Sequence, residues 1–140
     1  KNPSCGDCGP LLGNTDISGL GKQLQRNPEM QASLSAVVNG ALGNSRGWFA
    51  RADYIHTGSK YATDANITET GDSNRLNLRA GIETDTYRVE VYGNNVTDDQ
   101  TFTNYQFLID FAYINPGANR LLTAGLPNKP TYGVRATYNF

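Results

Sequence analysis

Apolar and polar residues alternate one by one along several stretches of this chain, most clearly from residue 130 to residue 140. A period of two is typical of a β-strand with one apolar face and one hydrated face. We therefore predict a strand at 130–140, with Arg135 on its hydrated face. The residues predicted on its apolar, lipid-facing side are Tyr132, Val134, Ala136, Tyr138 and Phe140. The aromatic residue at position 140 is typical of the last strand of an outer-membrane barrel, where aromatics collect at the interface with water.

Four earlier stretches repeat this alternation. One face of each is small or apolar, and in most of them the other face carries charged or amide groups. The sequence therefore predicts five strands, over residues 30–39, 48–59, 75–83, 87–96 and 130–140.

The connections between these strands differ in length. Residues 39–47 and 83–86 are short, polar and rich in turn-forming residues, whereas residues 61–74 and 97–129 are long. Short turns at one end and long loops at the other are typical of bacterial outer-membrane barrels, with the short turns on the periplasmic side. On this interpretation 61–74 and 97–129 are extracellular loops, and 1–29 is an extracellular loop with a strand entry.

A soluble antiparallel sandwich is the alternative, since its strands alternate too. The predicted apolar faces hold mostly Ala, Leu, Val and Tyr, without large residues to interdigitate in a core. The opposite faces suit a wide, wet lumen, and we prefer the barrel. The charged residues on those faces are Arg51, Asp53, Arg79, Glu83, Arg88, Glu90 and Arg135.

Composition narrows the function classes. The net charge is −1, so no basic field favours nucleic acid as a partner. Apolar residues make up 38% of the chain, and none of its runs approaches the ~20 consecutive apolar residues of a spanning helix. Membrane strands need only ~9–11 residues and alternate in polarity, so they remain compatible with this composition.

Two segments resemble the C-terminal end of TonB-dependent outer-membrane receptors: LNLRAGIETDTYRVEVYGNNVTDD at 76–99 and the closing TYGVRATYNF. Members of that family typically show a strand, a tight turn and a strand ending in Asn-Asn-Leu-Thr/Phe-Asp. A loop comes next, and a Pro-Arg-x-Tyr-Gly-like motif then precedes the last strand. Residues 22–30 resemble the segment that enters an earlier strand, so the resemblance covers about residues 20–140. The corresponding motifs here are Asn94-Asn95-Val96-Thr97-Asp98 and Pro130-Thr131-Tyr132-Gly133.

The resemblance implies an all-β fold, an antiparallel transmembrane β-barrel of about 22 strands with a plugged lumen. This chain would supply the last five or so strands, because no plug domain is recognisable in it. We accordingly expect a piece of a longer receptor, either a cleaved subunit or a degradation product.

The function implied is energised uptake of a scarce small-molecule ligand, such as an iron chelate, cobalamin or a glycan, at the bacterial cell outer membrane. The implied partners are the upstream strands and plug, outer-membrane lipid and a TonB-type energy transducer that acts through the missing N-terminal part. A passive porin-like or surface-binding barrel is the first alternative, and a soluble β-sandwich binding module is the second.

Cys5 and Cys8 form a single CxxC pair in a segment that we place outside the cell. A structural disulfide is the favoured interpretation in an oxidising compartment. Metal binding and redox chemistry remain alternatives, although a zinc site would ordinarily need two such pairs.

Candidate chemistry elsewhere is sparse. His56 is the single histidine and has no second histidine or carboxylate cluster near it in the sequence, so we predict no metal site there. The sequence has no nucleophile–base constellation and no glycine-rich phosphate loop. We therefore expect no enzyme activity, no catalytic residues and no cofactor.

The 97–129 connection is rich in aromatic residues, which would bind a ligand or pack on a neighbouring loop; the sequence favours neither. Residues 108–112 are a candidate extension of the fourth strand. Three roles are open for the charged residues that face the lumen: they would pair across strands, contact the plug or touch a ligand. The aromatic candidates are Phe102, Tyr105, Phe107, Phe111 and Tyr113.

Overall fold

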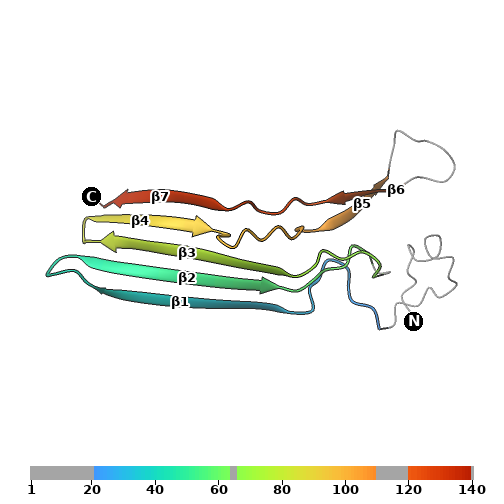
Figure 1. The fold of residues 1–140 in the computed structure, drawn as a ribbon, viewed down its shortest axis with the longest axis horizontal. Coiled ribbons are helices and arrows are strands. Elements are labelled where there is room, and N and C mark those ends of the chain that lie inside the picture. Colours follow the sequence, from blue (N-terminus) through green and yellow to red (C-terminus); the bar gives the residue numbers. More distant parts are fainter. Residues whose placement is uncertain (1–20, 64–65, 110–119, 140) are drawn as a thin grey trace. The chain divides into compact units, whose positions relative to one another are not determined.

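The computed structural model describes residues 21–63, 66–109 and 120–139, and these contain seven strands and no helix (Figure 1). Every strand pairing is antiparallel, which confirms the all-β, antiparallel fold class. The chain divides into two compact units, which are described separately below. The strands are β1 (Gln31–Ala41), β2 (Gly47–Thr57), β3 (Ser73–Glu83), β4 (Tyr87–Asn94), β5 (Tyr105–Ile109), β6 (Arg120–Ala124) and β7 (Thr131–Tyr138).

One unit is a five-stranded sheet in the order β1-β2-β3-β4-β7. These strands overlap the five ranges expected from the alternation, with small differences at the ends. The first strand continues to Ala41 because Gly40 still pairs with Trp48 instead of starting the turn. The last strand ends at Tyr138, and Phe140 lies outside the described residues.

Two tight turns close hairpins at the same end of this sheet (Figure 1). Between β1 and β2, the Leu42 N–H donates to the Arg46 carbonyl at 2.7 Å, and Gly43 adopts φ +83°, a left-handed conformation that favours glycine. Between β3 and β4, the Thr84 N–H donates to the Tyr87 carbonyl at 2.8 Å. The longer connections leave the sheet at its other end.

Four glycines of the sheet lie directly opposite aromatic residues of a neighbouring strand. A Cβ added at Gly133 would lie 2.6 Å from the Tyr92 hydroxyl oxygen, and one added at Gly93 would lie 3.0 Å from the Tyr132 ring. Rings that cover a bare backbone in this way stabilise the sheet and hold its register. The pairs are Gly40–Trp48, Gly81–Phe49, Gly133–Tyr92 and Gly93–Tyr132.

The other unit contains the antiparallel hairpin of β5 and β6, in which Leu108 lies opposite Leu121. This hairpin lies within the 97–129 connection that was expected to be one extracellular loop. Residues 108 and 109 of the suggested extension of β4 belong to β5, a separate strand that pairs with residues 120–124, whereas β4 ends at Asn94. Residues 110–112 of that suggestion lie outside the described residues. Apolar residues in both segments complement each other across the hairpin, a match that only the pairing reveals.

Candidate functional site

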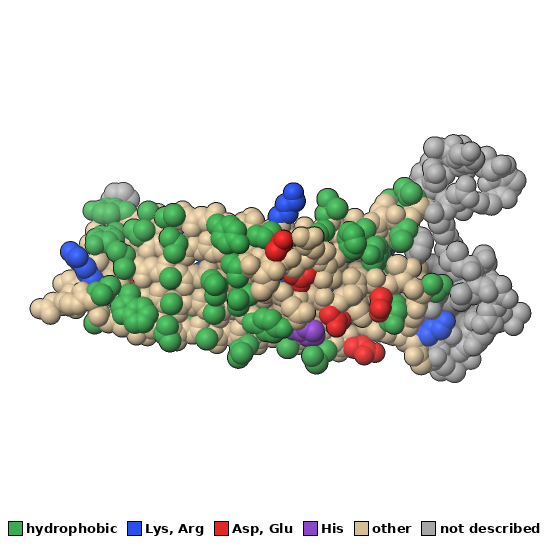
Figure 2. Space-filling model, in the orientation of Figure 1, with side chains coloured by type: hydrophobic (Ala, Val, Ile, Leu, Met, Phe, Trp, Pro, Cys, Tyr) green, Lys and Arg blue, Asp and Glu red, His purple; other side chains and the backbone are tan. Residues whose placement is uncertain are grey.

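The candidate functional surface is one face of the five-stranded sheet. The strand register joins apolar residues of all five strands into continuous rows across this face. Figure 2 shows hydrophobic side chains spread over the sheet, with few charged groups among them. One such row, taken across the sheet in order, is Val38, Ala50, Ala80, Val91 and Val134.

These apolar side chains are exposed. Leu34 and Val134 are each 70% exposed and Tyr132 is 68% exposed. Buried apolar side chains are few in the described residues, and the sheet has Phe49 on its opposite face. A contiguous apolar surface of this kind normally has an apolar partner or medium against it.

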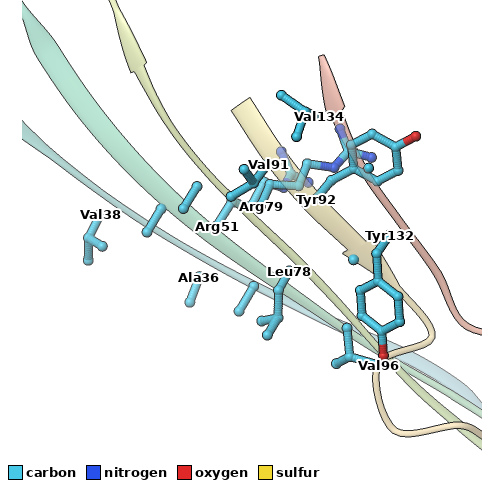
Figure 3. Close-up of a pocket in the computed structure, with 15 residues that line it drawn as sticks. Ala36, Val38, Arg51, Leu78, Arg79, Val91, Tyr92, Val96, Tyr132 and Val134 are labelled. Atoms are coloured by element: carbon cyan, nitrogen blue, oxygen red, sulfur yellow. The ribbon is translucent and has the colours of Figure 1, made fainter. Parts of the chain in front are cut away.

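A shallow groove of about 830 Å³ runs over the middle of this face (Figure 3). Its floor is made by small residues, which leave room above the backbone, while Leu78 and Tyr132 are among the larger groups that line it. The groove presents mainly apolar groups and therefore suits hydrocarbon better than a polar ligand. The small residues are Ala36, Ala50, Ala52 and Ala80.

Aromatic residues stand toward both ends of the apolar face. On β2, Trp48 and Tyr54 are six positions apart, about 20 Å at a rise of roughly 3.3 Å per residue. On β7, Tyr132 and Tyr138 have the same separation, and Tyr138 pairs with Tyr87 of β4. The face therefore carries two aromatic groups with aliphatic residues between them. Tyr132 and Tyr138 were predicted from the sequence to lie on this face, but the matching separation of Trp48 and Tyr54 on β2 was missed.

The opposite face is polar and carries ion pairs. The carboxylate of Asp53 accepts from Arg51 at 2.8 Å along the same strand and from the Ser35 hydroxyl at 2.6 Å across strands. Glu83 of β3 and Arg88 of β4 are 3.6 Å apart. The charged residues therefore pair both across strands and along one strand.

Glu90 is the centre of the largest of these clusters and is only 5% exposed. Its carboxylate lies 3.3 Å from Arg88 and 3.0 Å from Arg135. The two guanidinium groups also stand over aromatic rings, Arg88 at 4.1 Å from the Phe49 centroid and Arg135 at 5.5 Å from that of Tyr92. Arg135 thus lies on the face opposite Tyr138, as the alternation requires.

Asn95 organises the end of the sheet where the long connections leave. It is 3% exposed and has a left-handed φ of +51°. Its amide nitrogen donates to the carbonyls of Asp99 at 3.1 Å and Asn128 at 2.6 Å, and its side-chain oxygen accepts from the Asp99 N–H at 3.0 Å. The Asn-Asn-Val-Thr-Asp segment therefore ties the end of β4 to the chain that leads into β7.

Several sequence candidates can be placed individually. Tyr132, Val134, Ala136 and Tyr138 are all exposed on the apolar face. In the other unit, the rings of Phe102 and Tyr105 are 5.6 Å apart and tilted. The candidates outside the described residues are Cys5, Cys8, Phe111, Tyr113 and Phe140, and the side chain of Phe107 is likewise not described.

His56 shares an acceptor with a tyrosine. Its Nδ1 lies 2.8 Å from the Asn74 side-chain oxygen, which also accepts from the Tyr54 hydroxyl at 2.7 Å. Within the described ranges, no three His, Cys, Asp or Glu side chains gather in a way that could hold a metal ion.

No family model matches the chain, and no solved structure matches it significantly. Among the described residues there is no helix long and apolar enough to cross a membrane.

Proposed function

We propose that this chain is part of a TonB-dependent outer-membrane receptor, in which the five-stranded sheet forms part of the wall of a transmembrane β-barrel. The observation that carries the proposal is the exposed apolar face with aromatic groups toward both ends. Outer-membrane barrels have an apolar band about 25 Å tall between two aromatic girdles. The spacing of about 20 Å along β2 and β7 fits such a band.

The polar face supports the same assignment. In a barrel of about 22 strands, the size that the family resemblance implies, the inner surface is wet and carries charged side chains. Glu90 and its two arginines would face that lumen, while Val134 and Tyr138 would face lipid.

The connections supply the orientation. Both tight turns and the end of β7 belong to one end of the sheet, which we assign to the periplasm. The long connections at the other end are then extracellular, where ligands arrive.

The sheet edges point to further strands. Within the described residues, β1 and β7 each pair with a neighbour on one side only. In a bilayer, unpaired backbone N–H and C=O groups cost several kcal/mol each, so both edges need partner strands. The remainder of the same barrel is the partner that we propose.

The resemblance to TonB-dependent receptors supports energised uptake as the activity that we propose. The assembled receptor would take up an iron chelate, a cobalamin or a glycan, and the TonB-type transducer would supply the energy. The Asn94–Asp98 and Pro130–Gly133 motifs carry this part of the proposal.

Two adjacent valines allow a matched test of the lipid-facing side. Val37 and Val38 of β1 are 57% and 56% exposed, and they lie on opposite faces of the sheet. We would introduce Val37→Cys or Val38→Cys in a chain with Cys5 and Cys8 replaced by serine, within the full receptor in outer membranes. A water-soluble maleimide is expected to label position 37 and to leave position 38 protected by lipid.

A sheet with both faces in water would expose the two cysteines almost equally. Equal labelling at both positions, or a protein recovered in the soluble fraction, would therefore contradict the proposal. Labelling after transfer to denaturant serves as the control that both thiols are reactive.

A further inference from the structure

The unit that contains β5 and β6 has a small cavity of its own, about 220 Å³ in volume. Its wall comes from three parts of the chain that are distant in sequence. Two cations, two aromatic rings and neutral polar groups line it, and none of the lining residues that the structure describes is acidic. They include Arg26, Lys60, Tyr61, Thr70, Asn104 and Tyr105.

Backbone hydrogen bonds hold this wall in place. The Arg26 N–H donates to the Tyr61 carbonyl at 2.8 Å, and the Thr70 N–H donates to the Lys60 carbonyl at 3.0 Å. Nearby, the Gly125 N–H donates to the Asn104 carbonyl at 2.8 Å. Backbone hydrogen bonds therefore fix several parts of the cavity wall relative to one another, as in the largely preformed pockets that bind small molecules.

The two cations are available for a ligand. Among the described residues, neither Arg26 nor Lys60 forms an ion pair, whereas Arg51, Arg88 and Arg135 of the sheet all do. Two positive charges that line one cavity repel each other unless an anion lies between them.

Arg26 also has an unfavourable backbone conformation, with φ +60°. The other non-glycine residues with a left-handed φ in the described ranges are asparagine or aspartate, which adopt it readily. An arginine held in this region is a strained feature of the kind that occurs at functional sites. Here the strained residue is one that lines the cavity.

We propose that this cavity binds a small anionic ligand that consists of one ring with a carboxylate or phosphate group. The guanidinium of Arg26 and the ammonium of Lys60 would hold the anionic group. The tyrosines would pack on the ring, and the threonine and asparagine side chains would hydrogen-bond its hydroxyls. The volume is below the roughly 300–1,000 Å³ of pockets for drug-sized ligands, so it fits a single sugar-sized ring.

This inference deepens the proposed function, because it names a ligand class for the receptor. The binding itself does not depend on membrane location and can be measured separately.

Isothermal titration calorimetry of the detergent-solubilised full receptor that contains this chain tests it with three probes: D-glucuronate, D-glucose 6-phosphate and neutral D-glucose. At least one of the two acids is expected to bind ten times or more tighter than glucose. The tighter acid identifies the anionic group as carboxylate or phosphate.

Two variants remove the cations individually. Arg26→Asn removes the charge and introduces a residue that tolerates the left-handed backbone, and Lys60→Gln removes the other charge. Each is expected to weaken binding of the preferred acid by about 10-fold or more, the usual effect of losing a charged hydrogen bond. Lys129→Gln, an exposed cation outside the cavity, is the matched control and should leave binding unchanged.

Acids that bind no better than glucose, or variants that bind as tightly as the parent chain, would overturn the inference. The cysteine labelling described above is measured in parallel. If the acids do not bind but Val38→Cys is protected from labelling, only the ligand site is contradicted. If an acid binds but positions 37 and 38 label equally, only the proposed function is contradicted.

Discussion

At the scale of single residues, glycine positions under aromatic rings define the sheet more sharply than the apolar residues do. Tyr92 covers Gly133 on the polar face, and Tyr132 covers Gly93 on the apolar face. The pairing of β4 with β7 is thus held from both faces of the sheet. Arg135 adds a second layer, because its guanidinium stands over the Tyr92 ring.

Gly133→Ala is expected to destabilise the protein. The new Cβ would lie 2.6 Å from the Tyr92 hydroxyl oxygen and 2.7 Å from a ring carbon, so the ring would have to move away from Arg135. We expect a loss of about 1–3 kcal/mol, as for other overpacked positions. Urea unfolding of the receptor in detergent measures it.

Gly47→Ala is the matched control, since the nearest atom to its new Cβ would be 3.5 Å away, an ordinary contact. It should change stability by less than about 0.5 kcal/mol. Equal effects of the two substitutions would show that the Tyr92–Gly133 contact does not hold β4 to β7.

Asn95 illustrates what sequence can and cannot predict at one residue. The motif that contains it is recognisable from the sequence, but its role is not. Only the structure shows that its side chain reaches Asn128, 33 residues further along the chain. Such a contact depends on the register of distant strands, which has no local signature.

At the scale of elements, the period-two alternation predicted the strands of the large sheet because each has one apolar and one polar face. It failed for β5 and β6, which are five residues long and carry apolar residues on both faces. A short strand of that kind cannot be distinguished from an aromatic-rich loop by periodicity alone. The cavity lined by Arg26 and Lys60 was missed for another reason, because these two cations are far apart in sequence and form no motif.

The hairpin of β3 and β4 depends on one threonine. The Thr84 hydroxyl oxygen accepts from the Tyr87 N–H at 3.0 Å and from the Thr86 N–H at 3.3 Å. Thr84→Val keeps the shape of the side chain and removes the acceptor, so we expect a loss of about 1 kcal/mol. Denaturant unfolding or the temperature at which the folded band is lost on gels measures it.

Thr86→Val provides the comparison within the same turn. Thr86 is exposed, its backbone N–H donates to the Thr84 hydroxyl oxygen, and its carbonyl accepts from the Asn139 N–H at 2.8 Å. The substitution retains both hydrogen bonds. It should be nearly neutral. If Thr86→Val were as harmful as Thr84→Val, the effect would come from β-branched apolar residues in the turn and not from the lost hydrogen bonds.

At the scale of the whole molecule, the exposed apolar face and the two unpaired sheet edges make the isolated sheet unsuited to both water and lipid. Monomeric soluble proteins rarely expose contiguous apolar patches beyond roughly 300–600 Å². Here exposed apolar residues occur on all five strands of the sheet, from Leu34 on β1 to Tyr138 on β7. Water is therefore a poor medium for this surface, and lipid is a poor medium for unpaired edges.

The 140-residue chain on its own is accordingly expected to be stable in neither medium. Expressed alone without detergent, it should sediment as aggregate, because the apolar face and the edges of β1 and β7 would associate with other copies. Expressed together with the strands that precede it in the receptor, it should fractionate with the outer membrane and resist extraction by high salt. Sedimentation velocity and membrane fractionation distinguish these states. A stable, monodisperse monomer in plain buffer would contradict both the barrel assignment and the need for partner strands, because such a monomer must cover its apolar face by itself.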